Sequence, residues 1–253
     1  MLTLSSLSKN FGGLRVLEGI NLNVPQRGVF GLIGPNGAGK TTVFNLVTGL
    51  LNPSAGAIDF SGRRLNGMAP YEITRLGVAR TFQNIRVFKD MSLLENVLVA
   101  MAGKHRYQNV GLLLGSPAYR AAERREREMA QLLLTRVGLA AKALFAAGNL
   151  SYGEQRRLEI ARALASEPKL LLLDEPAAGM NSVEKQQLTD EIRKLDDSGI
   201  SILMIEHDMG FVMEICRRIT VLNFGRVIAE GTPDEIRGNT DVVEAYLGRD
   251  EAE

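Results

Sequence analysis

The chain has 253 residues, of which 45% are hydrophobic, and this size fits one large domain with a small attached one. Its 30 Lys and Arg residues balance 29 Asp and Glu residues, and the net charge of +1 argues against a dedicated nucleic-acid surface. The sequence has no run of about 18 apolar residues and no N-terminal signal pattern, so we expect a soluble intracellular protein.

The first part of the chain predicts strands and then a helix. Residues 2–24 predict paired antiparallel strands, and residues 57–60 continue this β-rich edge. Residues 29–33 contain only apolar residues and glycine, as expected of a buried strand, and residues 42–50 predict a helix. A strand, a short connection and a helix therefore follow one another in that order.

The connection between this strand and helix is rich in glycine. Residues 34–41, Gly-Pro-Asn-Gly-Ala-Gly-Lys-Thr, match the spacing G-x-x-x-x-G-K-T of a phosphate-binding loop. Glycines let backbone N–H groups approach phosphate oxygens, and the following helix N-terminus adds positive potential. Lys40 would bridge the terminal phosphates, and Thr41 offers a hydroxyl to Mg²⁺. The alternative is a chance glycine-rich turn, and the flanking strand and helix argue against it.

The middle of the chain predicts a separate helical subdomain. From about residue 92 to residue 148 the pattern is helical, with a break at residues 111–117 before it resumes over residues 119–137. The charge-rich residues 120–128 favour a solvated helix face over a lipid-headgroup or nucleic-acid patch. The preceding segment, residues 84–98, is largely apolar, and most of it is predicted to be core.

Ser151 begins the next predicted helix, which runs to about Ala165. Glu154 follows Ser151 by three residues, which is a capping-box pattern. The same arrangement places a serine hydroxyl, the Gly153 backbone and a helix N-terminus where a γ-phosphate could be held. The pattern leaves open whether that phosphate belongs to this subunit or to another.

Two acidic residues follow the apolar run of residues 170–173, which predicts a parallel strand covered on both faces. Asp174 and Glu175 would then lie at the carboxyl end of the strand, where open α/β sheets bind ligands. Asp174 is a natural outer-sphere partner of Mg²⁺, and Glu175 is placed to orient and deprotonate the water that attacks a γ-phosphate. The alternative is that the two acids only cap the next helix.

A final set of strands is expected near the C-terminus. Residues 200–205 predict a strand, and His207 follows it at the ligand-facing end if that strand is parallel to the others. A histidine at this place is otherwise only a polar end to a strand. Further strands are expected at residues 219–223 and 226–230, before short terminal helices.

The chain resembles ATP-binding cassette (ABC) ATPases in the order and spacing of its motifs. The motifs that match are the phosphate loop, Gln83, residues 150–155, residues 170–175 and His207. The match spans nearly the whole chain. It implies an α/β fold, a P-loop NTPase (RecA-like) core with an antiparallel β subdomain and a helical subdomain. Residues 1–253 would form a single nucleotide-binding domain, with 1–91 and 149–253 as catalytic core and β subdomain and 92–148 as helical subdomain.

The resemblance also implies roles for single residues. In that family two nucleotide-binding domains pair head to tail, so each ATP lies between one subunit's phosphate loop and the other subunit's signature serine. By motif, Glu175, His207 and Gln83 would be catalytic. Mg²⁺ would be bound by Thr41, Gln83 and Asp174. ATP would be bound by Phe11 (stacked on adenine), Val16, Gly34, Asn36, Gly37, Ala38, Gly39, Lys40, Thr41, Thr42, Ser151, Gly153 and Glu154.

Three residues depart from the usual family pattern. Tyr152 replaces the second glycine of the signature, Glu154 stands before Gln155, and Asn181 stands where many members have an aspartate. Asn181 can still donate and accept hydrogen bonds, which leaves its contribution to hydrolysis open. Together with residues 79–84, 95–100 and 243–248 and an insertion at about 103–122, these departures resemble the ATPase subunit of bacterial branched-chain amino acid importers.

This resemblance implies an ATP hydrolase that powers the import of leucine, isoleucine and valine at the cytoplasmic face of the inner membrane. Its partners would be a second ATP-binding subunit, identical or paralogous, transmembrane permease subunits and, indirectly, a solute-binding protein, with no nucleic acid. A membrane subunit would dock on residues 84–98. The alternatives are a lipopolysaccharide-export ATPase, which shares the tyrosine signature, and a soluble ABC-type ATPase outside transport. No Asn-Lys-x-Asp guanine motif supports a GTPase.

Overall fold

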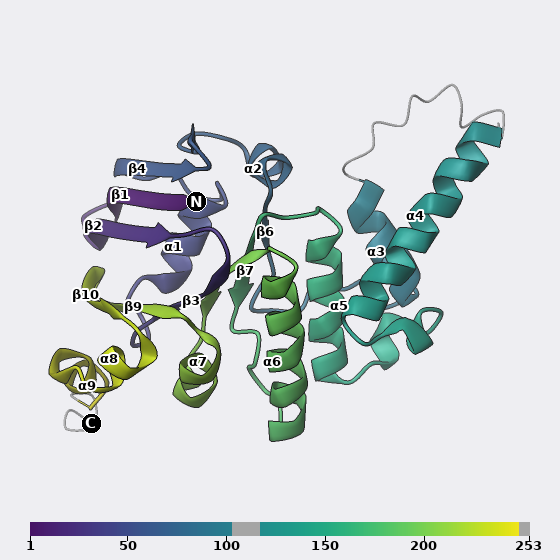
Figure 1. Cartoon of the computed structure of the whole chain (residues 1–253). Helices are drawn as coiled ribbons and strands as arrows, with labels where there is room; N and C mark the ends of the chain where they lie inside the picture. Colours follow the sequence, from purple (N-terminus) through teal and green to yellow (C-terminus); the bar gives the residue numbers. More distant parts are fainter. Residues whose placement is uncertain (103–116, 248–253) are drawn as a thin grey trace.

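The computed structural model describes residues 1–102 and 117–247, and it contains two β-sheets with helices around them (Figure 1). One sheet has the strand order β2-β1-β4-β5 and the other has the order β10-β9-β3-β8-β7-β6. Among the residues described, no helix is long and apolar enough to cross a bilayer. The C-terminal residues 248–253 and most of the expected insertion at 103–122 lie outside the described residues.

The smaller sheet is antiparallel and confirms the strands expected in residues 2–24. β1 (Leu2–Phe11) pairs with β2 (Leu14–Val24) on one side and with β4 (Ala55–Phe60) on the other. The residues expected to continue this β-rich region lie in β4, and the short β5 (Arg63–Arg64) pairs with β4 at the edge of the sheet. Alternate residues of these strands are buried, since one face of the sheet covers the core.

The larger sheet carries the predicted apolar runs at its centre. It consists of β3 (Gly28–Ile33), β6 (Val78–Arg80), β7 (Leu170–Asp174), β8 (Ser201–Ile205), β9 (Arg218–Asn223) and β10 (Arg226–Gly231). Its strands are parallel except for β10, which pairs antiparallel with β9. The carboxyl ends of β3, β6, β7 and β8 therefore meet at one edge, which is where such sheets bind ligands.

Both faces of the larger sheet are covered, which explains why its central strands lack alternation. Leu170 and Leu172 of β7 pack in a core with α1 (Lys40–Val47) and the smaller sheet. Leu171 and Leu173 pack in a second core with helices on the opposite face. That face carries α5 (Tyr152–Leu164), α6 (Ser182–Asp197) and α7 (Met209–Ile215).

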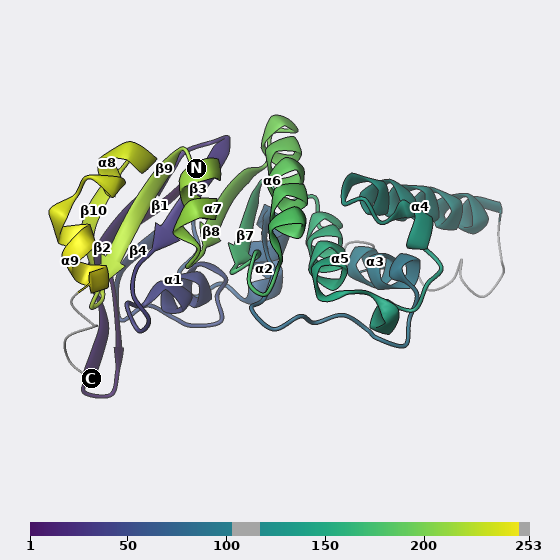
Figure 2. The same ribbon diagram turned by 90° about the horizontal axis from the view of Figure 1, so that it is seen from below.

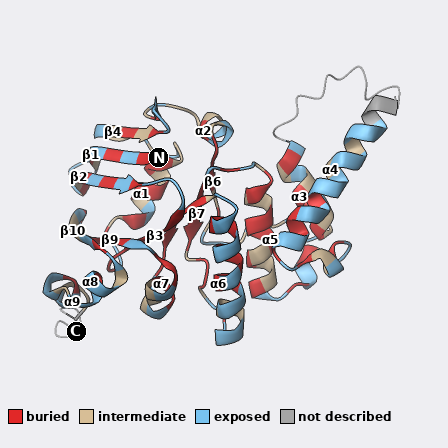
Figure 3. Cartoon of the chain, viewed as in Figure 1, coloured by how far each residue is buried: buried red, intermediate tan, exposed pale blue. Residues whose placement is uncertain are grey.

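The predicted helical subdomain lies at one end of the molecule. α3 (Leu93–Ala102) and α4 (Pro117–Arg136) pack beside α5, away from the smaller sheet (Figures 1 and 2). The outer part of α4 is largely exposed (Figure 3), as expected of residues 120–128. Two 3₁₀ turns, Ala140–Lys142 and Ala147–Asn149, connect α4 to α5.

Several element boundaries differ from the sequence prediction, and two elements were missed. The helix expected at residues 42–50 is α1, which begins at Lys40 and ends at Val47, because Gly49 adopts a left-handed φ of 72°. α4 begins at Pro117, two residues before the expected start. The short α2 (Pro70–Leu76) and β6 were not predicted. The described part of the chain ends in α8 (Pro233–Arg237) and α9 (Thr240–Leu247).

Candidate active site

A pocket of about 340 Å³ opens at the sheet edge where β3, β6, β7 and β8 end. The phosphate loop forms one wall of this pocket, and the segments after β6, β7 and β8 complete it. The structure thus brings together residues that lie far apart in the sequence. The lining residues, all of them predicted, are Val16, Asn36, Gly37, Gly39, Lys40, Thr41, Thr42, Gln83, Glu175 and His207.

The phosphate loop has a backbone that requires glycine at two positions. Gly34 has a φ of 146°, and a Cβ atom there would lie 2.0 Å from the carbonyl oxygen of Leu222. Gly39 has a φ of 102°, and its Cβ would lie 2.5 Å from Cδ2 of Leu17. Gly34 and buried Ala38 support the loop without lining the pocket. The spacing of the motif therefore reflects close contacts behind the loop as well as access for a ligand.

Lys40 begins α1, so the positive end of this helix faces the pocket. The first turn of α1 contains no acidic residue that would neutralise this potential. The Lys40 ammonium donates hydrogen bonds to the carbonyl oxygens of Gly34, at 2.6 Å, and Pro35, at 2.9 Å. A helix N-terminus with an ammonium group beside it is a binding site for anions such as phosphate.

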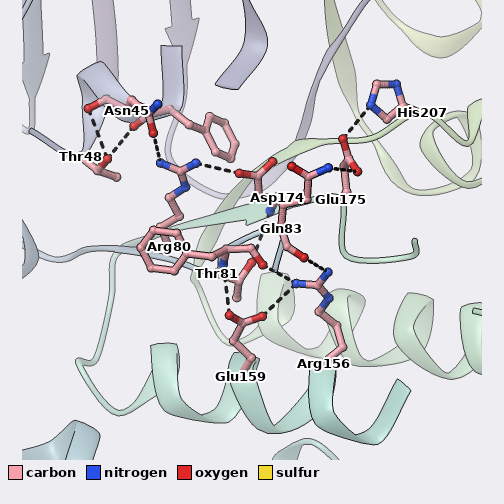
Figure 4. Close-up of polar contacts among 12 residues, drawn as sticks. Asn45, Thr48, Arg80, Thr81, Gln83, Arg156, Glu159, Asp174, Glu175 and His207 are labelled. Atoms are coloured by element: carbon pink, nitrogen blue, oxygen red, sulfur yellow. Dashed lines mark hydrogen bonds and ion pairs between the residues drawn. The ribbon is translucent and has the colours of Figure 1, made fainter. Parts of the chain in front are cut away.

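Glu175 lies across the pocket from this loop and has a strained backbone. Its φ is +48°, a left-handed conformation that costs of the order of 1–3 kcal/mol in a residue other than glycine. Its carboxylate accepts a hydrogen bond from the Gln83 side-chain amide at 3.0 Å, and Nε2 of His207 lies 2.7 Å from its other oxygen (Figure 4). The carboxylate is thereby aimed into the pocket by two polar neighbours.

The alternative that Asp174 and Glu175 only cap the next helix is wrong. The next helix is α6, which begins at Ser182 and is capped by Asn181. The side chain of Asn181 accepts a hydrogen bond from the Glu184 N–H at 3.0 Å, and Glu184 accepts one from the Asn181 N–H. Asn181 therefore has a structural role at the start of α6.

Sequence reasoning missed Glu206, which connects the segments that carry Glu175 and His207. Its buried carboxylate accepts hydrogen bonds from the N–H of Ala177, at 2.6 Å, and of His207, at 3.0 Å. Burial raises the pKa of Glu206. The signal available in the sequence was an acidic residue directly after an apolar strand and directly before His207.

Asp174 is only 2% exposed and forms an ion pair that the sequence did not predict. Its carboxylate accepts a hydrogen bond from Arg80 at 2.7 Å, and Arg80 also donates to the Asn45 side chain of α1 at 2.7 Å (Figure 4). Arg80 thus fixes the end of β7 against β6 and α1. The only sequence signal for this contact was a basic residue directly before Thr81 and three positions before Gln83.

The side-chain oxygen ligands near the pocket suit Mg²⁺ that is bound together with a nucleotide. They are the Thr41 hydroxyl, the Gln83 amide and the Asp174 carboxylate. In the described part of the chain, no group of three or more His, Cys, Asp or Glu side chains could hold a metal by itself. Mg²⁺ takes few protein ligands and relies on water and phosphate oxygens, so this sparse set fits that ion.

The predicted residues Ser151, Gly153 and Glu154 lie apart from this pocket. Ser151 caps α5, and its hydroxyl accepts a hydrogen bond from the Glu154 N–H at 3.3 Å while Glu154 accepts one from the Ser151 N–H at 3.1 Å. The predicted capping box is confirmed. None of the three residues lines the pocket, so within one chain they do not reach the phosphate loop.

Phe11 also lies outside the pocket. It ends β1 and is 45% exposed, with the Lys9 ammonium 5.0 Å from the centre of its ring. Val16 of β2, in contrast, does line the pocket. A larger, mostly apolar hollow of about 630 Å³ lies between α7, α8 and α9 and contains no predicted site residue.

Comparison with known proteins agrees with this fold. Residues 17–178 match the ABC transporter family, and residues 226–252 match the family described as branched-chain amino acid ATP-binding cassette transporter. An ATP-binding cassette of an ABC transporter, solved in its ADP conformation, superimposes with a TM-score of 0.85 at 30% identity, covering 98% of this chain and 99% of that one. A cassette dimer bound to ADP and Pi gives a TM-score of 0.77 at 26% identity, covering 92% of this chain and 99% of that one.

Curated relatives match over almost their full length. The high-affinity branched-chain amino acid transport ATP-binding protein BraF of Pseudomonas aeruginosa is 48% identical, with 98% of both chains covered. LivG of Escherichia coli, which has the same description, is 45% identical with the same coverage. The lipopolysaccharide export system ATP-binding protein LptB of Acidithiobacillus ferridurans is 36% identical, covering 98% of this chain and 97% of its own. The protein therefore belongs to the ABC transporter family, as one of its ATP-binding, ATP-hydrolysing proteins.

Proposed function

We propose that this protein powers the import of branched-chain amino acids, leucine, isoleucine and valine, by hydrolysing ATP. The observation that carries this proposal is the 48% identity with a branched-chain amino acid transport protein over nearly the whole of both chains. The lipopolysaccharide export protein is a more distant relative, at 36% identity. The match of residues 226–252 to a branched-chain amino acid transporter family supports the same choice.

The geometry of the pocket supports a specific division of labour in hydrolysis. The phosphate loop and Lys40 hold the phosphates, and Glu175 orients the attacking water and accepts its proton. Gln83 and His207 contact both oxygens of Glu175, so they aim its carboxylate and are placed to contact the water and the γ-phosphate. Thr41, Gln83 and Asp174 would hold Mg²⁺, which neutralises developing phosphate charge when bound.

A second subunit completes the site in this proposal. Ser151, Gly153 and Glu154 lie at the start of α5, outside the pocket of their own chain, and a helix start of this kind can bind an anion. In a head-to-tail dimer this helix start reaches the phosphate held by the other subunit. The solved cassette dimer bound to ADP and Pi supports such a pairing, either between identical chains or with a paralogue.

The helical end of the molecule is where we place the membrane subunits. Phe88, Leu144 and Phe145 are exposed apolar residues. Their two segments lie side by side, since the Leu93 N–H donates to the Phe145 carbonyl and the Gly148 N–H donates to the Lys89 carbonyl. An exposed apolar patch of this kind marks a protein contact. The protein would thus lie at the cytoplasmic face of the membrane, and a solute-binding protein would act through the permease.

Uptake of labelled leucine, isoleucine and valine tests this function. The assay compares cells lacking the protein with cells complemented by the wild type or by Glu175→Gln. Uptake restored by the wild type alone is expected, because transport then depends on hydrolysis. Uptake that stays the same in all three strains would contradict the proposal and favour lipopolysaccharide export.

A further inference from the structure

Two side chains of helix α5 form hydrogen bonds with the main chain of Phe82 and Gln83. The Arg156 guanidinium donates to the carbonyl oxygen of Phe82 at 2.5 Å and, through its other terminal nitrogen, to that of Gln83 at 2.7 Å. The carboxylate of Glu159 accepts a hydrogen bond from the Phe82 N–H at 3.3 Å. Figure 4 shows both side chains rising from the helix toward this segment. The main-chain position of Gln83 is thus set from α5.

Both side chains are buried charges. Arg156 is fully buried, Glu159 is 5% exposed, and they form an ion pair at 2.9 Å. Burial raises the pKa of Glu159, against the effect of Arg156. A buried ion pair contributes little net stability compared with apolar residues of similar size, so fold stability alone does not account for it. The planar fork of arginine does offer what a lysine lacks, two donors aimed at two neighbouring carbonyls.

The contacts continue in both directions from this pair. Toward the helix start, Arg156 lies just over one turn from the cap Ser151 and donates to the hydroxyl of Tyr152 at 3.3 Å. Toward the pocket, the Gln83 side chain donates to Glu175. Ser151 and Glu175 are thereby connected through a rigid helix and one peptide segment. A physical network of this kind can couple two sites.

We propose that Arg156 and Glu159 are positioning residues that make the Gln83 side chain follow the movement of α5. When a partner subunit or phosphate orients the Ser151 end of this helix, the pair carries Gln83 into register with Glu175. This inference rests on the proposed role of Gln83 in hydrolysis. It assigns the coupling between α5 and the Glu175 carboxylate to the side chains of Arg156 and Glu159.

The chain offers a matched control on the same helix. Arg157, the next residue, also forms a largely buried ion pair, with Glu191 of α6 at 3.4 Å. Its hydrogen bonds within the described part of the chain go to Glu191 and to the Val137 carbonyl, and not to residues 82 and 83. Arg157→Ala removes a comparable buried pair without touching Gln83. It therefore reports the effect of destabilising α5 in general.

The test is a double-mutant cycle on steady-state ATP hydrolysis by the full chain, with Tm measured for each variant. Arg156→Ala should lower kcat about tenfold with KM for ATP little changed, and it should lower kcat no further in a Gln83→Ala background. Arg156→Lys should also lower kcat, because one ammonium cannot serve both carbonyls, and it guards against a failure of the alanine variant to fold. Arg157→Ala should keep kcat within about twofold while lowering Tm.

Four results would overturn the inference. Arg156→Ala and Arg156→Lys could leave kcat unchanged while Gln83→Ala lowers it, which removes the positioning role but keeps that of Gln83. Arg156→Ala could lower kcat equally in both backgrounds, or Arg157→Ala could lower it as much, and either result reduces the pair to a structural one. If Gln83→Ala itself leaves kcat unchanged, the proposed role of Gln83 fails and the inference fails with it.

Discussion

Glu175 combines an unfavourable backbone with a well-defined set of contacts. Its positive φ is maintained because its N–H donates to the Ile205 carbonyl at 2.9 Å and its carboxylate is held by Gln83 and His207. Strain of this kind persists only where the surroundings determine the conformation, and it gathers at functional sites. The residue that the sequence placed at the carboxyl end of β7 is therefore also the residue whose conformation the fold enforces.

Replacing Glu175 by glutamine should separate nucleotide binding from hydrolysis. Glu175→Gln keeps the size of the side chain but removes the proton acceptor, so we expect ATP binding with a loss of kcat of about 10²–10⁴-fold. ATP-bound dimers should accumulate, which size-exclusion chromatography with light scattering would detect. Unchanged turnover would exclude Glu175 as the general base.

Glu191 should make the folding stability depend on pH. Burial raises the pKa of Glu191 to about 7, against the smaller effect of Arg157, from an ordinary value of 4.5. Between these two values the folded protein holds a proton that the unfolded chain has released, so the stability contributed by Glu191 is present at low pH and is lost as pH rises to about 7.

Glu191→Gln should remove this dependence. From about pH 5 to pH 8, the free energy of unfolding of the variant should rise relative to the wild type, by up to about 3 kcal/mol. Urea unfolding of both proteins across this range measures the difference. Asp197→Asn, an exposed acid on the same helix, is the control. A difference that stays constant with pH would contradict the raised pKa.

At the scale of elements, local sequence signals were most reliable where a motif dictates backbone geometry. The start of α5 followed from the spacing of Ser151 and Glu154, because a capping box satisfies N–H groups that the helix leaves open. The bounds of α1 were not predicted correctly, and its end was missed because Gly49 was not recognised as the residue that ends the helix. β6, with three residues, is too short to show a periodicity.

Asn181 illustrates an element boundary that can be tested. Asn181→Ala removes the cap of α6 and should lower the free energy of unfolding by about 1 kcal/mol. Asn181→Asp keeps the acceptor and places a negative charge at the helix start, so its stability should stay within a few tenths of a kcal/mol of the wild type. Denaturant unfolding measures both changes. Equal stability of Asn181→Ala and the wild type would argue against the cap.

At the scale of the whole molecule, the two halves of the expected ATP site lie apart from each other. The pocket at the sheet edge contains Lys40 and Glu175, whereas Ser151 at the start of α5 does not contribute to it. In the proposed dimer, one chain would provide half of each of two sites. A two-fold dimer in which each chain supplies the part that the other lacks would make both complete.

Mixing two inactive variants tests this arrangement. Lys40→Ala removes the phosphate-binding ammonium, and Ser151→Asp keeps a good helix cap but places a negative charge against the γ-phosphate. Each variant alone should lose most ATP hydrolysis. Mixed dimers contain one intact composite site, so activity should recover on mixing. Failure to recover, with dimers present, would indicate that each site is built within one chain.

Local spacing in the sequence was enough to predict the phosphate loop, the strand that ends in Asp174 and Glu175, and the cap of α5, because each depends on residues a few positions apart. It did not reveal the ion pair between Arg80 and Asp174, which are 94 positions apart and meet only because β6 pairs with β7.

The sequence also did not reveal the hydrogen bond from Arg156 to the Gln83 carbonyl, which joins residues 73 positions apart. Strand order and helix packing decide such contacts, and they depend on the burial of both faces of the larger sheet, a property that no local spacing records. Local motifs therefore predict the chemistry of the site, whereas the tertiary structure decides the contacts that orient its residues.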